Sequence, residues 1–217
     1  MNNNLTEVVF IVDESGSMFN LQDDTSGGIN SFIEQQKKEP GDAWFTLVKF
    51  SSFPKAVYWR VPINEVEPLT AANYSPGGCT ALYDAVGSTI DRIGFALAET
   101  PEPERPGHVI FVITTDGYEN ASHQYSGSQL REMVTYQKVK YSWDFLFLGA
   151  DIDAFAAAKD IGISADRSAS YANTKIGTET MYNVMTKTIS NYRASGTVDS
   201  DWVNGLVTNG CADKTSN

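Results

Sequence analysis

The sequence predicts an open α/β fold, in which helices cover both faces of a mostly parallel, six-stranded sheet. Short runs of consecutive β-branched and aromatic residues, such as 8–12 and 109–113, predict strands that are buried on both faces. Segments with an apolar residue at every third or fourth position alternate with these runs and predict amphipathic helices. The resulting order, β-α-β-β-α-β-α-β-α-β-α, is typical of a doubly wound sheet.

Six segments are predicted to be strands because they are apolar and rich in β-branched residues. The second and third are close enough in sequence to form a hairpin, which would place one antiparallel strand at an edge of the sheet. In the third, Val57, Trp59 and Val61 alternate with more polar residues, as in a half-exposed strand. The predicted strands are 8–12, 44–50, 56–61, 109–113, 145–148 and 167–171.

Five segments are predicted to be helices. The clearest is 82–97, in which apolar residues recur every three or four positions. Ser126 and Gln129 have the spacing of a capping box at the start of another helix. The predicted helices are 29–36, 82–97, 126–137, 153–161 and 181–192.

The chain is predicted to form one domain, residues 1–195, followed by a C-terminal tail, residues 196–217. The tail has little hydrophobic periodicity, so it is expected to be flexible or to form a short docking helix around Trp202 and Leu206. We expect that its removal leaves a soluble protein.

Composition argues against several classes of protein. The chain has 16 lysine and arginine residues against 27 aspartate and glutamate residues, a net charge of −11. Binding to nucleic acid or to an anionic membrane surface relies on excess positive charge, so neither is expected. No segment has the ~20 apolar residues of a membrane helix, and residues 1–6 do not resemble a signal peptide. Cys79 and Cys211 are too few for a disulfide framework, so we expect a cytoplasmic protein with free thiols.

Carboxyl and hydroxyl side chains gather where the predicted strands end. Asp13, Ser15 and Ser17 follow the first strand, Asp116 follows the fourth, and Thr80 precedes the helix at 82–97. In open α/β sheets, ligands bind beyond the carboxyl ends of the strands, where the strand order reverses. Two carboxylates and three hydroxyls, with no histidine among them, suit Mg²⁺ or Mn²⁺ better than zinc. The sequence therefore predicts a site for one of these ions.

The pattern Asp13-x-Ser15-x-Ser17, with a separate Thr80 and a separate Asp116, resembles the complete metal-ion-dependent adhesion site (MIDAS) of von Willebrand factor type A (vWA) domains. The similarity covers roughly residues 5–195, and the chain looks most like stand-alone, cytosolic members from bacteria and phages. The resemblance implies a Rossmann-like vWA fold in which the three hydroxyls bind Mg²⁺ directly or through water and the two aspartates complete the octahedron.

The resemblance also implies an open coordination position on the ion, which accepts a carboxylate from a partner protein. The expected function is therefore a non-enzymatic, metal-dependent protein–protein interaction module whose partner exposes an aspartate or glutamate. In a second interpretation the ion is purely structural and only ties three loops together.

A third interpretation is a metal-dependent hydrolase or phosphatase that uses the same acidic site. Ser17, His123 and Asp116 could form a catalytic triad, but the sequence contains no Gly-x-Ser-x-Gly elbow. An aspartyl-phosphate enzyme would carry a second aspartate two positions after Asp13, where this chain has Ser15.

Residues that flank the predicted ligands are expected to have ordinary roles. Glu14 and Glu119 are predicted to be solvated, although Glu119 is the one obvious further protein ligand. Asn120 could hydrogen-bond within its loop, and Trp59 on the edge strand is the one tryptophan with a possible role in recognition. Cys79 is expected to be unreactive because no lysine, arginine or histidine is near it in the sequence.

Overall fold

In the computed structural model, which describes residues 1–70 and 72–208, six strands form one sheet in the order β3-β2-β1-β4-β5-β6. All neighbouring strands are parallel except β2 and β3, which form the antiparallel edge. The predicted fold class is confirmed, and every predicted strand is present. The strands are β1 (Asn2–Asp13), β2 (Asp42–Phe50), β3 (Pro54–Pro62), β4 (Pro106–Thr115), β5 (Asp144–Ala150) and β6 (Ser168–Tyr171).

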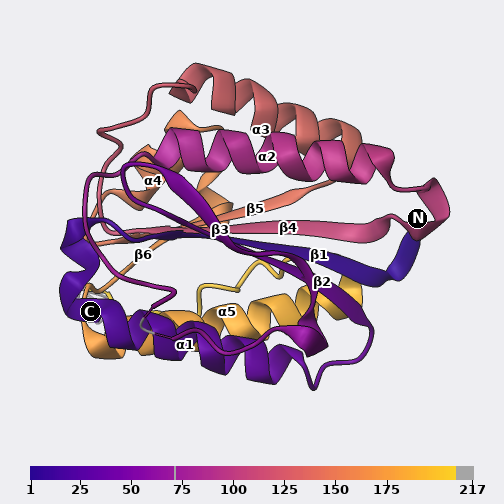
Figure 1. Cartoon of the computed structure of the whole chain (residues 1–217), viewed down its shortest axis with the longest axis horizontal. Coiled ribbons are helices and arrows are strands. Elements are labelled where there is room, and N and C mark those ends of the chain that lie inside the picture. The colour runs from indigo at the N-terminus through magenta and orange to yellow at the C-terminus, as the bar shows by residue number, and fades with distance from the viewer. Residues whose placement is uncertain (71, 209–217) are drawn as a thin grey trace, which may run out of the picture.

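The five predicted helices are also present and cover both faces of the sheet. Helices α1 and α5 pack on one face, and α2 and α3 pack on the other, as Figure 1 shows. Apolar residues of α4 belong to the same core as those of α2 and α3. The helices are α1 (Gln22–Gln36), α2 (Leu82–Glu99), α3 (Gly127–Tyr141), α4 (Ala154–Asp160) and α5 (Lys175–Ser195). None of the helices in the described ranges is both long and apolar enough to cross a bilayer.

The central strand β1 explains why the sequence shows continuous apolar runs. Phe10 and Val12 point into the core beneath α1 and α5, whereas Val9 and Ile11 point into the core beneath α2 and α3. Successive side chains of a strand point to opposite faces, so a strand with a core on each face needs an apolar residue at every position.

The order of the strands reverses between β1 and β4, which are direct neighbours. Val12 lies opposite Thr114 in this pair, so the two strands end side by side. Their next residues, Asp13 and Thr115, mark the end of each strand. The sheet therefore brings the segments that follow β1 and β4 to one place.

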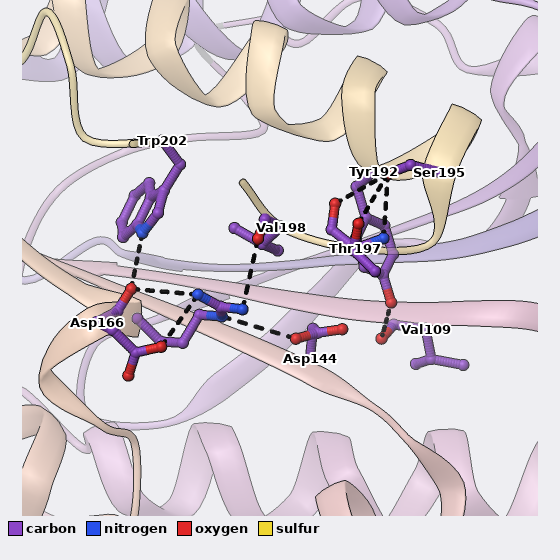
Figure 2. A network of polar contacts seen from close by, with 9 residues as sticks. Val109, Asp144, Asp166, Tyr192, Ser195, Thr197, Val198 and Trp202 are labelled. Atoms are coloured by element: carbon purple, nitrogen blue, oxygen red, sulfur yellow. Dashed lines mark hydrogen bonds and ion pairs between the residues drawn. The ribbon is translucent and has the colours of Figure 1, made fainter. Parts of the chain in front are cut away.

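Residues 196–208 pack against the domain. Val198 and Trp202 are buried, and both belong to the core beneath α1 and α5. The Trp202 indole Nε1 donates a 2.9 Å hydrogen bond to the Asp166 carbonyl, as Figure 2 shows. Residues 200–205 form turns, so the docking helix that the spacing allowed is not formed there. Whether this segment can be removed stays a prediction.

The same C-terminal segment lies beside the edge strand β6. The Ala172 backbone N–H, which directly follows β6, donates a 2.7 Å hydrogen bond to the Val207 carbonyl. Arg167 also donates to the Val198 carbonyl at 3.5 Å. Cys211 and the rest of the predicted tail beyond residue 208 lie outside the described residues.

Candidate metal centre

Three loops meet beyond the carboxyl ends of β1 and β4. The loop after β1 is joined to the loop before α2 by a 2.8 Å hydrogen bond from the Gly77 N–H to the Glu14 carbonyl. The loop before α2 is joined to the loop after β4 by a 3.0 Å bond from the Asn120 N–H to the Thr80 carbonyl. Asn120 also accepts a 2.9 Å bond from the Thr80 N–H through Oδ1, so its side chain links two of the loops.

Hydrogen bonds link four of the five predicted ligands in a continuous chain. The Ser15 N–H donates to Asp13 Oδ1 at 2.7 Å, and the Ser15 and Ser17 hydroxyl oxygens are 3.1 Å apart. Ser17 Oγ then donates to Asp116 Oδ1 at 2.6 Å. The side chains that follow β1 and β4 are therefore in direct contact.

The fifth predicted ligand, Thr80, lies beside this chain. A Cβ atom built on Gly117 would lie 3.2 Å from Thr80 Oγ1, so the threonine hydroxyl packs against the backbone directly after Asp116. Any side chain at position 117 would press on that hydroxyl. The structure thus brings all five predicted residues to one locality.

Asp13 is the most deeply buried member of the group, with none of its surface exposed. Burial raises the pKa of its carboxyl to about 6, because loss of water disfavours the charged form. Hydrogen bonds from Thr115 and Ser15 oppose this rise in pKa, and the nearby Asp116 adds to it. Thr115 Oγ1 donates to Asp13 Oδ2 at 2.6 Å, and the Tyr74 hydroxyl donates to the Asp13 carbonyl oxygen at 2.6 Å.

The donor set fits a hard divalent ion. Ser15 and Thr80 are buried, whereas Ser17 is exposed and Asp116 is partly exposed, so the group opens to solvent on one side. A cation there would compensate the unfavourable proximity of two carboxylates, one of which is buried. Within residues 1–70 and 72–208, no group of three or more histidine, cysteine, aspartate or glutamate side chains is placed to hold a metal. An ion at this site would therefore depend on the hydroxyl oxygens.

The predicted solvation of Glu14 and Glu119 is wrong. Glu14 is buried and its Oε1 lies 2.6 Å from the Lys49 ammonium, which compensates its charge. Glu119 Oε2 accepts from the Tyr83 N–H at 2.9 Å, and its Oε1 accepts from the Ser122 N–H at 2.6 Å. The first turn of α2 has N–H groups without helical partners, and Glu119 satisfies one of them. Both carboxylates are thus engaged away from the predicted ligands.

The triad considered for a hydrolase is not formed. Ser17 Oγ donates to Asp116, and no hydrogen bond joins it to His123 in the part of the chain that the structure describes. The His123 N–H instead donates to Asp84 Oδ2 at 2.9 Å, in a loop that packs on the start of α2.

The Trp59 ring is half-buried beneath the Arg92 guanidinium, 4.0 Å from the ring centroid.

The sequence interpretation missed two residues that contact the carboxylates. Thr115 donates to Asp13, as described above, and its position at the polar end of an apolar strand was the available signal. Asn173, which follows β6, donates from Nδ2 to Asp116 Oδ2 at 3.4 Å. No local pattern marks Asn173, because the contact joins residues far apart in the chain. Cys79 is exposed and forms no disulfide with a described residue.

Several solved structures share this fold. Proximal thread matrix protein 1 from the mussel byssus, in a form with a zinc-occupied MIDAS motif, is 15% identical with a TM-score of 0.60 and matches 85% of this chain and 46% of its own. A von Willebrand factor type A protein from Catenulispora acidiphila is 14% identical with a TM-score of 0.58 and matches 84% of this chain and 42% of its own. The PilB minor pilin from Streptococcus sanguinis is 14% identical with a TM-score of 0.61 and matches 88% of this chain and 63% of its own.

This chain therefore spans between 42% and 63% of the length of these three proteins. No protein-family model matches its sequence, and no curated protein is similar to it in sequence. With identities near 15%, the similarity establishes the architecture and not the activity. The chain has the Rossmann-like fold of vWA domains.

Proposed function

We propose that this protein is a divalent-metal-dependent interaction module, in which Asp13, Ser15, Ser17, Thr80 and Asp116 hold Mg²⁺ or Mn²⁺. The observation that carries the proposal is the hydrogen bond from Ser17 to Asp116, which joins two predicted metal ligands from separate loops at the open side of the site. A similar structure with zinc at its MIDAS motif supports a divalent ion at this position. When bound, the ion supplies a Lewis acid for one further oxygen ligand.

The charges of the site favour a carboxylate as that further ligand. Two aspartates balance a divalent cation, and the hydroxyls fill other positions without adding charge. Glu14 and Glu119, the flanking carboxylates, are held by Lys49 and by backbone N–H groups. A partner carboxylate would therefore meet no competition from these two side chains.

Without an ion, the same partner would be repelled. At an effective dielectric constant near 20, two like charges 4 Å apart repel by about 4 kcal/mol, which is on the order of a thousandfold in affinity. Partner binding should therefore depend on the metal. We propose a cytoplasmic module of bacterial or phage type, whose partner is neutral or basic around one exposed aspartate or glutamate.

Calorimetry with Mg²⁺ tests the metal site directly. The wild-type chain is expected to bind one ion, and Ser17→Ala and Asp116→Ala are expected to abolish the heat of binding. Glu132→Gln, in an exposed position on α3, is a control that should bind Mg²⁺ as the wild type does. Absence of any binding heat, together with identical melting curves in Mg²⁺ and EDTA, would contradict the proposal.

Affinity capture from a host lysate, in Mg²⁺ and again in EDTA, distinguishes a recognition site from a purely structural ion. A partner that is retained only in Mg²⁺, and lost by one Asp→Asn or Glu→Gln change on its own surface, supports recognition through the ion. Retention that is insensitive to EDTA would favour the structural role.

A further inference from the structure

Three exposed aromatic side chains belong to the loops that surround the predicted metal site. Phe19, Phe53 and Tyr118 are 67%, 75% and 57% exposed. Burying an aromatic ring is among the largest hydrophobic gains available to a side chain, so an exposed ring leaves that gain available for binding another molecule. Grouped exposed apolar side chains are typical of surfaces that bind another molecule.

Two of these rings are tied to predicted ligands by sequence. Phe19 lies two residues after Ser17, in the short 3₁₀ helix Gly16–Leu21, and Tyr118 lies two residues after Asp116. The Tyr118 hydroxyl accepts a 3.1 Å hydrogen bond from the Asp153 N–H. This bond fixes the far end of the tyrosine side chain although much of the residue stays exposed.

Phe53 belongs to the turn between β2 and β3, which contacts the loop before α2. The Cys79 N–H donates to Ser52 Oγ at 3.2 Å, and the Ala81 N–H donates to the Ser51 carbonyl at 2.8 Å. These bonds bracket Thr80, so the turn that carries Phe53 lies against the segment that carries the predicted threonine ligand. Each of the three ligand-bearing loops thus has an exposed aromatic residue on or beside it.

We infer that Phe19, Phe53 and Tyr118 form an aromatic rim, which contacts apolar side chains on either side of the partner's carboxylate. The inference rests on the proposed function and adds the chemistry of the partner: one acidic residue in an apolar segment of a protein. Apolar contacts around a polar centre exclude water and strengthen the electrostatic contact at that centre.

The charge of the chain points to the same kind of partner. A net charge of −11 repels an acidic segment at long range, so a tract of several acidic residues is a poor ligand. A single carboxylate between apolar residues avoids most of this repulsion and gains the contact with the rim. Short-range apolar contact then adds affinity that long-range electrostatics does not supply.

Three synthetic peptides test the inference on the full chain in Mg²⁺, by NMR titration of the ¹⁵N-labelled protein. One peptide has a single aspartate between two leucines, the second has the aspartate between two serines, and the third has asparagine between two leucines. We expect the leucine-flanked aspartate to bind at least fivefold more tightly than the serine-flanked one. The asparagine peptide should not bind, and EDTA should abolish binding of both aspartate peptides.

Variants locate the contact. Phe19→Ser, Phe53→Ser and Tyr118→Ser should each reduce the preference for leucine over serine, and Phe53→Ser is the most informative because no predicted ligand is near it in sequence. Phe95→Ser is the matched control, since Phe95 is 71% exposed but lies on α2 outside these loops, and it should keep the full preference.

The outcomes separate this inference from the function on which it rests. Equal binding of the two aspartate peptides, or a preference that survives in all three rim variants, would overturn the aromatic rim and leave the metal–carboxylate contact standing. If Mg²⁺ binds to the protein and neither aspartate peptide does, both the rim and the recognition of a carboxylate are wrong.

Discussion

Ser17 Oγ donates a 2.6 Å hydrogen bond to Asp116 Oδ1 across 99 positions of sequence. The bond exists because β1 and β4 are neighbours at the point where the strand order reverses. It holds two oxygen atoms that can bind a metal at the solvent side of a buried aspartate, in the loops that directly follow these two strands.

Mg²⁺ is expected to raise the melting temperature of the wild-type chain. A ligand that binds only the folded state stabilises it by roughly 2.7 kcal/mol at a hundredfold excess over Kd. For a chain of this size that corresponds to about 5–10 °C. Calorimetric scans in Mg²⁺ and in EDTA measure the shift, and Asp116→Ala should remove it. A shift that persists in this variant would place the ion elsewhere.

Lys49→Met is expected to destabilise the fold, because it leaves the Glu14 carboxylate buried without its cation. The two side chains are each about 10% exposed and their charged atoms are 2.6 Å apart. Removing one partner of a buried ion pair costs about 3–5 kcal/mol. Urea unfolding gives the difference.

The double variant Glu14→Gln/Lys49→Met is the control for this prediction, since it removes both charges. It should recover much of the loss. If the single and double variants were equally unstable, packing by the lysine side chain would be responsible, and not its charge.

The buried pair of Glu7 and Arg60 predicts a pH dependence of stability. Burial raises the pKa of the Glu7 carboxyl from 4.5 to about 7. The Arg60 guanidinium, whose Nε lies 3.0 Å from Glu7 Oε2, opposes this rise in pKa. Between these two values the folded state binds more protons than the unfolded state. The contribution of Glu7 to stability therefore falls as the pH rises from about 4.5 to about 7, and stays low above that range.

Glu7→Gln should remove this dependence. The free energy of unfolding of the variant, minus that of the wild type, should increase by on the order of 2–3 kcal/mol when the pH is raised from 5 to 8. Urea unfolding at both pH values measures this change, and Glu132→Gln on the surface serves as the control. Parallel pH profiles for wild type and Glu7→Gln would contradict the prediction.

Trp202→Ala is expected to cost about 3–5 kcal/mol, because it removes a large buried side chain from the core. Val203→Ala, at the next position but 37% exposed, should change stability by less than about 0.5 kcal/mol. Deletion of 196–217 should therefore lower stability and solubility, contrary to the expectation from sequence. A soluble deletion variant with wild-type stability in urea would restore that expectation.

Local patterns account for most of what the sequence predicted. The apolar runs of β1 and β4 and the spacing of α2 depend on residues close in the chain, and they are periodic because each element faces a core. Asp13, Ser15 and Ser17 lie within five consecutive positions, so their pattern is visible in the sequence as well. Their contact with Asp116 followed from the predicted sheet.

Long-range contacts account for what the sequence did not predict. Glu119 accepts from the Tyr83 N–H at the start of α2, a contact that no periodicity in its own loop indicates. Trp202 packs in a core made by distant elements, and the few apolar residues around it in sequence did not show that it would be buried. Asn173 contacts Asp116 only because β6 ends near the same edge of the sheet.

The hydrogen bond from Ala172 to Val207 has a consequence for self-association. An edge strand has unpaired backbone N–H and C=O groups with which a strand of a second chain can form hydrogen bonds, and such pairing leads to aggregates. Here the C-terminal segment of the same chain lies beside β6, and the hydrogen bond from Ala172 to Val207 uses one of the backbone groups at this edge of the sheet. A chain cut by a protease before Val207 would lose this cover, and its sheet could then be extended by a neighbouring molecule.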